Sequence, residues 1–349
     1  MYTIKIGNEV LYAPALQHAA YTVLAPKVCL DVHAAGSLSF TLPPGNRLYD
    51  VIQRMTTVAT VYQDGEEIFR GRVLTEENSL YKQKSIYCEG VRTYLQDSLA
   101  APYTYTGTAK DLLKKLISEH NSQVEAAKQF TVRHVTVERA EEKIQDLQNV
   151  AYWNTHQEIE EKLLSVYGGY LRIEASGGKL YLDWVQEYAY TSAQQIRFGV
   201  NLLDIQDKKD AYDLFTILRP LGESKIGEDG EYGDPVSIAS VNGGKDYIQD
   251  DEAVRKYGKI WKAYTWGHIS DPAKLLTKGR EYLKTGAEIR TLTVRAIDMH
   301  MLDGSVDAIR IGQKVKIHIE PHGIDVTMRC TKMEIDLENP ENTVYIFGE

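Results

Sequence analysis

The clearest pattern in the chain is the alternation of apolar and polar positions over residues 58–99, which predicts strands joined by tight turns. Asp64-Gly65 predicts a hairpin turn, because both residue types tolerate the positive φ that a two-residue turn requires. A third strand is expected near Ile86–Cys88, and a short helix over residues 91–99 closes the unit. The side chains expected to define the first two strands are Val58, Thr60, Tyr62, Ile68, Arg70, Arg72 and Leu74.

The rest of residues 1–97 continues in short strand patterns, at 2–6, 28–32 and 38–42. Pro43-Pro44-Gly45 marks a turn, and one or two helical turns are expected over 46–54. Many short strands separated by glycine and proline indicate a barrel or a sandwich.

Residues 98–197 have a different character and predict an α+β unit. Thr108 begins a helix with a capping-box-like pattern ending at Asp111, and its apolar face is followed by a stop at Asn121. A second helix is expected from Thr155 to Gly168-Gly169. A hairpin then follows over 170–185 around a Ser-Gly-Gly turn. The buried positions expected on the two helices are Leu112, Leu113, Leu116, Ile117, Ile159, Leu163 and Val166.

From Phe198 the chain returns to strands, interrupted by an exposed acidic loop at 223–235 and a helix that opens at Asp271-Pro272. The strands expected in this part are 213–222, 289–297, 309–319, 326–337 and 344–347. The predicted fold class is α+β, mostly β. We divide it into a first β-barrel domain (1–97), an α+β insertion (98–197), a second β-barrel domain (198–222 with 287–349) and a smaller α+β insertion (223–286).

Charge and composition narrow the function classes. The 349 residues carry a formal net charge of −9, spread along the chain without a basic stripe, which argues against sequence-independent binding to nucleic acid. The chain has 23 tyrosines against six phenylalanines, which suits half-buried strand faces or subunit contacts.

The three cysteines, Cys29, Cys88 and Cys330, are far apart and odd in number, so we expect folding in a reducing compartment. We see no signal peptide and no apolar run of the ~18 residues that span a membrane, and we expect synthesis in the cytoplasm without membrane insertion.

We predict no catalytic, cofactor-binding or metal-binding residues. The Gly-Lys pairs at Gly178, Gly244 and Gly258 lack the rest of a phosphate-binding loop, and no nucleophile elbow or zinc-protease motif is present. His318 and His322 have helical metal-ligand spacing, but Pro321 and Gly323 break such a helix, so we interpret them as turn histidines. Asp303, Asp307, Asp250, Asp251 and Glu252 lack calcium-loop spacing and are interpreted as solvated turn charges.

Two weaker site hypotheses stay open. A cysteine peptidase would need a thiol beside a histidine, and His33 is the nearest in sequence, although Cys29 and Cys88 lie in strand-like patterns typical of core cysteines. An aromatic sugar platform could be built from the pairs Tyr103/Tyr105, Tyr188/Tyr190 and Trp261/Trp266, for which core or subunit contacts are the ordinary explanation. The loop at 223–235 could cover a ligand.

Eight segments, in this order, resemble the prophage tail-endopeptidase family. They are EEIFRGRV (66–73), YCEGVRTYLQDS (87–98), TGTAKDLLKKLISEHN (106–121), DLFTILRPLG (213–222), VNGGKDYIQDDEAVRKYGKI (241–260), SDPAKLLTKGREYL (270–283), AIDMHMLDGSVDAIRIGQKVKI (296–317) and MEIDLENPENTVYIFG (333–348). The ordered series is much more specific than any one member.

This resemblance implies a phage tail-tip protein similar to the central hub of contractile-tail baseplates, in which two barrels per chain build a trimeric ring around the DNA exit channel. The expected partners are two further copies of the chain, distal tail and tail-tube proteins, a tape-measure protein, and a C-terminal fibre or lysin protein. DNA would pass without specific binding, and the protein would reside in the virion tail. Relatives often continue into a fibre or a peptidoglycan-cleaving domain, which we expect to lie outside these residues, so no enzyme activity is predicted.

Two alternatives to the structural hub are a peptidoglycan-cleaving tail endopeptidase and a carbohydrate-binding adhesin. A bacteriocin-like tail or another contractile injection device is a related possibility. For a ring, we expect the edge strands to form the subunit contacts, and the hairpin at Asp64-Gly65 and the strand Arg310–Ile319 are the candidates.

Overall fold

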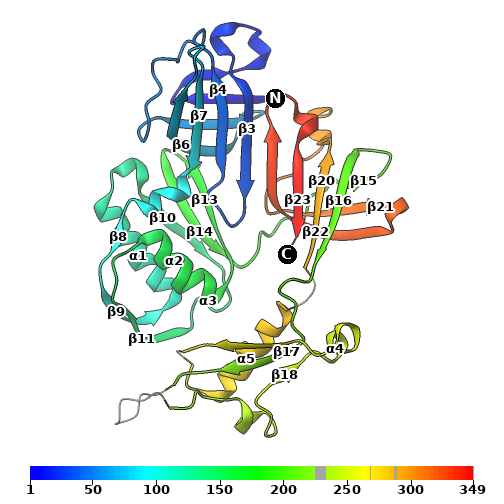
Figure 1. Cartoon of the computed structure of the whole chain (residues 1–349). Coiled ribbons are helices and arrows are strands. Elements are labelled where there is room, and N and C mark those ends of the chain that lie inside the picture. Colours follow the sequence, from blue (N-terminus) through cyan, green and yellow to red (C-terminus); the bar gives the residue numbers. More distant parts are fainter. Residues whose placement is uncertain (225–232, 268, 287–288, 349) are drawn as a thin grey trace. The chain divides into compact units, whose positions relative to one another are not determined.

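A computed structural model describes residues 1–224, 233–267, 269–286 and 289–348. The fold is α+β and mostly β, as predicted (Figure 1). The chain forms two compact units. The first contains Met1–Gln206 and Leu292–Gly348, and the second contains Asp207–Thr291. Most of the predicted loop at 223–235 lies outside the described residues.

The N-terminal strands form what we call the N-terminal module, in the sheet order β3-β4-β7-β6-β5-β1-β2. All neighbours in this order are antiparallel. The strands are β1 (Tyr2–Ile6), β2 (Glu9–Tyr12), β3 (Leu24–Asp31), β4 (Ser37–Leu42), β5 (Val58–Gln63), β6 (Glu66–Asn78) and β7 (Lys84–Gly90).

The predicted hairpin turn is confirmed. Asp64 and Gly65 both have positive φ, 50° and 88°, as a two-residue turn between β5 and β6 requires. The alternating positions do not mark the apolar core face of these strands, because the most deeply buried apolar side chains are Ala59, Val61 and Val73. A bulge at Val61/Tyr62 shifts the register, and β5 is covered on both sides, so simple alternation does not identify its core face.

Residues 91–99 contain the expected helical segment, which is a 3-10 helix over Val91–Gln96. The helix expected over 46–54 is absent from this described stretch. Successive hydrogen-bonded turns replace it, with Tyr49 donating to the Asn46 carbonyl and Val51 to that of Leu48. The Asn46 side chain bonds to the Leu11 and Thr22 carbonyls and favours this turn geometry over a helix.

The last strands of the chain form what we call the C-terminal module, in the order β16-β20-β23-β22, with β21 on β22 and β15 on β21. The strand expected over 309–319 starts only at Lys314, because residues before it form a turn in which Gly312 has φ 82°. The strands are β15 (Ile196–Arg197), β16 (Leu202–Asp210), β20 (Ile289–Ala296), β21 (Lys314–Ile319), β22 (Ile324–Asp336) and β23 (Val344–Gly348).

The insertion between the modules folds around a separate hydrophobic core, in which Leu112, Leu113, Leu116 and Trp184 are inaccessible to solvent. Its elements are β8 (Leu99–Ala100), β9 (Tyr103–Thr108), α1 (Ala109–Gln123), β10 (Phe130–Val135), β11 (Lys143–Asn149), β12 (Trp153–Asn154), α2 (Thr155–Ile159), a π-helical turn (Glu160–Leu164), α3 (Ser165–Tyr167), β13 (Tyr170–Ser176) and β14 (Lys179–Val185). Figure 1 shows α1 and α2 beside β13 and β14.

Two helices in this insertion begin at a residue whose side chain, or whose neighbour's side chain, caps the helix by accepting a hydrogen bond from a backbone amide. The Thr108 hydroxyl accepts from the Asp111 amide at 3.1 Å, so the predicted cap of α1 is confirmed. The second helix begins at Thr155, as predicted, and it is capped by Asn154, whose side chain accepts from the Gln157 amide at 2.8 Å.

A buried carboxylate at Asp183, on β14, links three strands of the insertion, because its donors lie on β10 and β13. It accepts hydrogen bonds from Arg133 (2.7 Å), Arg172 (2.7 Å) and the backbone amide of His134 (3.0 Å). Burial opposes ionisation, but these donors outweigh it and lower the pKa of Asp183 to about 2.

We therefore expect Asp183→Asn to destabilise the protein by about 2–3 kcal/mol at pH 7. A lowered pKa gives a contribution that is complete above about pH 4 and disappears as the pH falls toward 2, so the difference from the parent must shrink in acid. Urea unfolding at pH 7 and pH 3 measures this. Glu174→Gln is the matched control, because this half-exposed carboxylate bonds to the same Arg133. An equal loss in both variants would contradict the assignment.

The second unit contains a three-stranded sheet, β18-β17-β19, and two helices. The predicted Asp271-Pro272 start is confirmed, since the Asp271 side chain accepts from the Ala273 amide at 2.8 Å. The predicted strand 213–222 is shorter, because only its C-terminal half pairs. The elements are β17 (Ile217–Leu221), β18 (Ile248–Gln249), α4 (Asp251–Tyr257), β19 (Trp261–Thr265) and α5 (Pro272–Lys284). Within the described part of the chain, the helices are too short or too polar to cross a membrane.

Candidate functional site at the junction of the two modules

The N- and C-terminal modules are joined into one sheet by strands about 300 residues apart in sequence. β22 pairs antiparallel with β3 from Lys332↔Asp31 to Asp336↔Lys27. The ladder continues at both ends, where Val32 donates to the Thr331 carbonyl and Leu337 donates to the Pro26 carbonyl, each at 3.0 Å. A single 13-stranded sheet results, and Figure 1 shows β3 beside β22.

One hydrophobic core lies under this shared sheet. It includes Ile4, Leu38 and Val73 of the N-terminal module together with Ile317 and Phe347 of the C-terminal module. All five are inaccessible to solvent. Because both modules bury apolar surface in the same core, separating them would expose it, and we expect them to move as one body.

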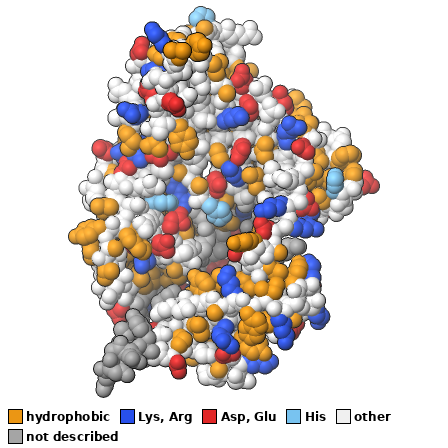
Figure 2. Space-filling model, in the orientation of Figure 1, with side chains coloured by type: hydrophobic (Ala, Val, Ile, Leu, Met, Phe, Trp, Pro, Cys, Tyr) orange, Lys and Arg blue, Asp and Glu red, His pale blue; other side chains and the backbone are white. Residues whose placement is uncertain are grey.

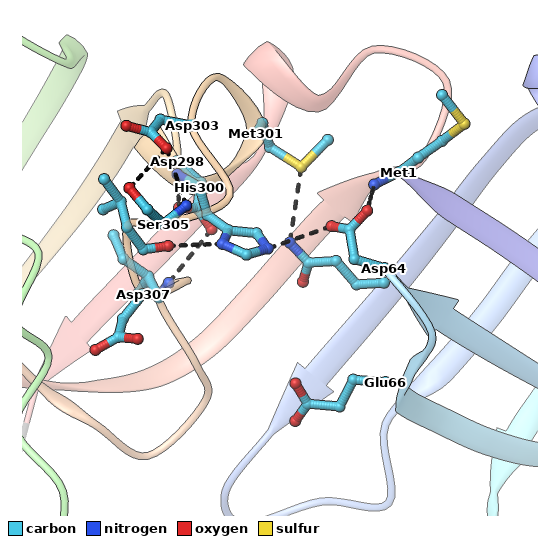
Figure 3. Close-up of polar contacts among 12 residues, drawn as sticks. Met1, Asp64, Glu66, Asp298, His300, Met301, Asp303, Ser305 and Asp307 are labelled. Carbon is cyan, nitrogen blue, oxygen red and sulfur yellow. Dashed lines mark hydrogen bonds and ion pairs between the residues drawn. The ribbon is translucent and has the colours of Figure 1, made fainter.

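A second set of contacts joins the modules through polar side chains (Figure 3). The β5–β6 hairpin meets the segment after β20, which forms a 3-10 turn over Met299–Met301. Asp64 accepts from the Met1 ammonium and lies 3.3 Å from Nε2 of His300. The Gln63 amide donates to Sδ of Met301 at 3.7 Å.

Arg310 completes this junction from the other side of the hairpin. Its guanidinium donates to Oε1 of Gln63 at 2.8 Å and pairs with the Glu66 carboxylate at 2.5 Å. The carboxylates of Asp64 and Glu66 in the hairpin thus contact His300 and the cationic Arg310 of the C-terminal module. Burial opposes ionisation of Asp64, but the bonds from the Met1 ammonium and His300 outweigh it and lower the pKa of Asp64.

The segment that presents His300 is held by a buried carboxylate. Asp298 accepts from the His300 amide (3.1 Å), the Ile309 amide (3.3 Å) and the Gln194 side chain (2.8 Å). His300 is fixed further by a 2.6 Å hydrogen bond between Nδ1 and the Val306 carbonyl. These bonds within the C-terminal module fix the position of His300, so the side chain is preorganised for its contact with the hairpin.

The shared ladder makes a specific prediction about two side chains. Glu334 and Cys29 are directly opposite, so a cysteine at 334 would have the Cα separation of about 5 Å that a disulfide needs. We expect Glu334→Cys to form an intrachain disulfide on mild oxidation, seen by non-reducing peptide mapping. The matched controls are Glu334→Cys with Cys29→Ser, and Lys332→Cys, whose partner is Asp31. Equal cross-linking of positions 332 and 334 to Cys29 would contradict the register.

Both predicted subunit-contact elements are engaged within the chain. The Asp64-Gly65 turn meets the C-terminal module, as described above. β21 has β22 on one side and β15 on the other, with Ile317 paired to Val326 and to Ile196.

The predicted turn charges lie apart from one another. His318, on β21, lies 3.4 Å from Asp325, while His322 lies in the 3-10 turn that follows. Asp303 accepts from the amide and hydroxyl of Ser305, which lowers the pKa of Asp303. Asp250 caps α4. The described residues contain no cluster of histidine, cysteine and acidic side chains arranged to hold a metal ion.

The cysteines do not form an activated thiol. Cys88 and Cys330 are buried, and burial raises the pKa of the Cys88 thiol to about 12 and that of Cys330 further. Cys29 is half-buried and lines a surface hollow with His33, but burial also raises its pKa. A nucleophilic thiolate requires the opposite shift.

The aromatic pairs are dispersed over the fold. Tyr103 donates to the buried Glu158 at 2.9 Å, and Tyr105 donates to the Thr108 carbonyl. Tyr188 packs on Tyr170 while Tyr190 is exposed. Trp266 is buried in the second unit, whereas Trp261 is half exposed. No single platform gathers these pairs among the described residues.

One pair of side chains with hydrolase-like geometry was not foreseen. Ser98 donates to Nδ1 of His120 at 2.7 Å and contacts the Thr155 hydroxyl at 2.7 Å, while Nε2 of His120 donates to the Lys128 carbonyl. Ser98, His120 and Thr155 are 2%, 0% and 1% exposed, so substrate has no access to the serine. Burial lowers the pKa of His120. The trio links β8, α1 and α2, and residues so far apart in sequence carry no local signal of it.

The fold is similar to that of three solved phage tail proteins. It is similar to the tail protein of Neisseria meningitidis MC58 (14% identity, TM-score 0.68, covering 100% of this chain and 96% of that one). It is similar to the 43 kDa tail protein of prophage MuSo2 of Shewanella oneidensis (12%, 0.65, 99% and 97%). It is also similar to the prophage tail protein gp18 of Listeria monocytogenes EGD-e (15%, 0.61, 100% and 94%).

A family model matches the C-terminal part of the sequence. Residues 189–348 match the model described as prophage endopeptidase tail, so this part of the chain carries the pattern of that family. The match confirms the resemblance for the five ordered segments that lie within it, from 213–222 to 333–348. No curated protein sequence matches the chain.

Proposed function

We propose that the chain is the structural hub of a phage-type tail tip, a homotrimer that forms a ring at the distal end of the tail tube and lines the DNA exit channel during host attachment. The observation that carries this proposal is the pairing of β3 with β22. It joins two strand-rich modules into one body, and three such chains would present six modules around a ring.

The net negative charge of the chain supports a channel through which DNA passes without binding. Three copies would carry a formal charge of −27, three times −9. Acidic and basic side chains are interspersed over the N-terminal module on the face shown in Figure 2. An acidic lumen would repel the phosphate backbone, so DNA would pass without being held. The proposed location is the virion tail, after synthesis in the host cytoplasm.

Each proposed partner protein is assigned to one side or to the lumen of the ring. The tail-tube and distal tail proteins would meet one side of the ring, the tape-measure protein would end at its lumen, and a fibre or lysin protein would meet the other side. The domain boundaries at residues 97, 197 and 286 are retained in this proposal. The boundary at 222 is not, because β17 pairs with β18 and β19 in the second unit. The hub would act through its shape, and this role needs no catalysis by the chain itself.

An exposed apolar segment of the C-terminal module is our candidate for the subunit contact. Phe198, Val200 and Leu203 are 57%, 61% and 47% exposed, and they lie within six residues at the start of β16. Solvated apolar side chains gathered in this way are typical of association surfaces. A partner chain would cover them in a ring.

We expect Val200→Glu to shift the solution mass from trimer to monomer without lowering the melting temperature, because the side chain is exposed in the single chain. Multi-angle light scattering and thermal unfolding measure the two effects. Val150→Glu is the control, since Val150 is 84% exposed but belongs to the insertion. A trimer that tolerates Val200→Glu would exclude this segment as the contact.

A further inference from the structure

In the sheet of the second unit, α5 covers one face, and the other is partly open: Ile217 is buried there, but Arg219 and Trp261 are about half exposed. α5 packs beside β17 and β18, and Gly279 of this helix lies against Pro220 and Ile248 (Figure 1). Side chains alternate across a strand, so Arg219 points away from the helix. β19 pairs parallel with β17 and places Ala263 beside Arg219 and Trp261 two residues earlier, which puts Trp261 on the same open face.

Four side chains gather on this open face. The ring of Trp261, 51% exposed, meets the ring of Tyr247 edge-on with centroids 5.1 Å apart. The guanidinium of Arg219 lies 5.7 Å from the indole centroid and pairs with the Asp246 carboxylate at 3.0 Å. Arg219 and Asp246 remain about half exposed. The guanidinium lies over the indole ring, so this ring has a planar donor and a planar acceptor beside it, both open to solvent.

We propose that this cluster is a saccharide-binding site, in which the apolar face of a pyranose ring stacks on Trp261 and its hydroxyls bond to Arg219 and Asp246. An indole face is electron-rich and attracts the C–H groups on the flat side of a sugar. Neighbouring hydroxyls can donate to a carboxylate and accept from a guanidinium, so the ion pair supplies both kinds of partner. The proposal goes beyond the structural role of the hub and does not depend on its oligomeric state.

The ion pair has a second consequence for ligand choice. Arg219 and Asp246 already compensate each other, so the cluster carries no net charge toward an incoming ligand. A neutral, hydroxyl-rich ligand fits this balance, whereas an anion would have to compete with Asp246 for the guanidinium. Each hydroxyl exchanges water for a charged partner at an exposed site, so single-ring affinity should be in the millimolar range.

Saturation-transfer NMR on the full chain tests the proposal, with chitotetraose and maltotetraose as the probes. We expect saturable transfer to the ring protons of at least one of them. Trp261→Ala should weaken binding at least tenfold, and Asp246→Asn should weaken it several-fold. Both side chains are substantially exposed, so the variants should keep the parent's melting temperature.

Tyr212→Ala is the matched control, because Tyr212 is 92% exposed in the same unit but lies outside the cluster. It should bind the probes as the parent does. Three results would overturn the proposal. They are no saturable transfer to either tetrasaccharide, equal transfer with Trp261→Ala, and Trp261-dependent transfer to a proline-rich peptide in place of both sugars.

Discussion

The Ile317→Asp variant should fail to fold its C-terminal module. Ile317 is inaccessible to solvent on β21 and lies between Ile196 of β15 and Val326 of β22. An aspartate there would lose the buried isoleucine surface and place a carboxylate in an apolar core, at a combined cost of more than about 5 kcal/mol. This approaches the whole stability of a typical domain. Circular dichroism and thermal unfolding should show the loss of a cooperative transition.

Lys316→Ala is the matched control for this variant, because Lys316 is the adjacent residue on β21 and faces solvent near Asp325. An exposed ion pair contributes at most about 1 kcal/mol, so this variant should unfold nearly as the parent does. If Ile317→Asp kept the parent's melting temperature and solution mass, the assignment of Ile317 to a core shared by the two modules would be contradicted.

Gly90→Ala, which adds one methyl group at the end of β7, should strongly lower the stability of the protein. A Cβ at residue 90 would lie 1.8 Å from the Ala35 carbonyl oxygen, which no side-chain rotation can relieve. The Gly90 amide also donates to the Gly36 carbonyl at 3.0 Å, so the two backbones are held together. We expect a loss of about 3 kcal/mol or more, measured by urea unfolding.

The companion variant is Gly45→Ala. No atom lies within 4 Å of a Cβ built at Gly45, and its φ is not in the left-handed region. Its stability should change by no more than about 0.5 kcal/mol, or rise slightly through a stiffer unfolded chain. Equal effects of the two substitutions would show that the β3–β4 turn does not approach Gly90 as described.

The elements predicted well from sequence are those fixed by neighbouring residues. Asp64-Gly65 specifies its turn through two backbone conformations. Thr108 and Asp271 specify helix starts through one side-chain hydrogen bond each. Such interactions span two or three residues, so the local pattern is sufficient to reveal them.

The junction of the two modules could not be predicted from local sequence patterns, because the residues that form it are distant in sequence. Glu334 pairs with Cys29, and Arg310 bonds to Glu66, yet strand alternation gives no information on which strands meet. The Asp64-Gly65 turn was predicted as a subunit contact, and its contact with His300 of the same chain could not be predicted for this reason. Only the resemblance of the ordered segments indicated that the first and last strands belong to one assembly.

We propose that three copies of this chain close into a ring, and light scattering combined with negative-stain imaging can decide whether they do. We expect a mass of about 118 kDa, three times 39.5 kDa, and particles with a central hole. A mass of 39.5 kDa at every concentration up to that used for imaging, or compact particles without a hole, would contradict it.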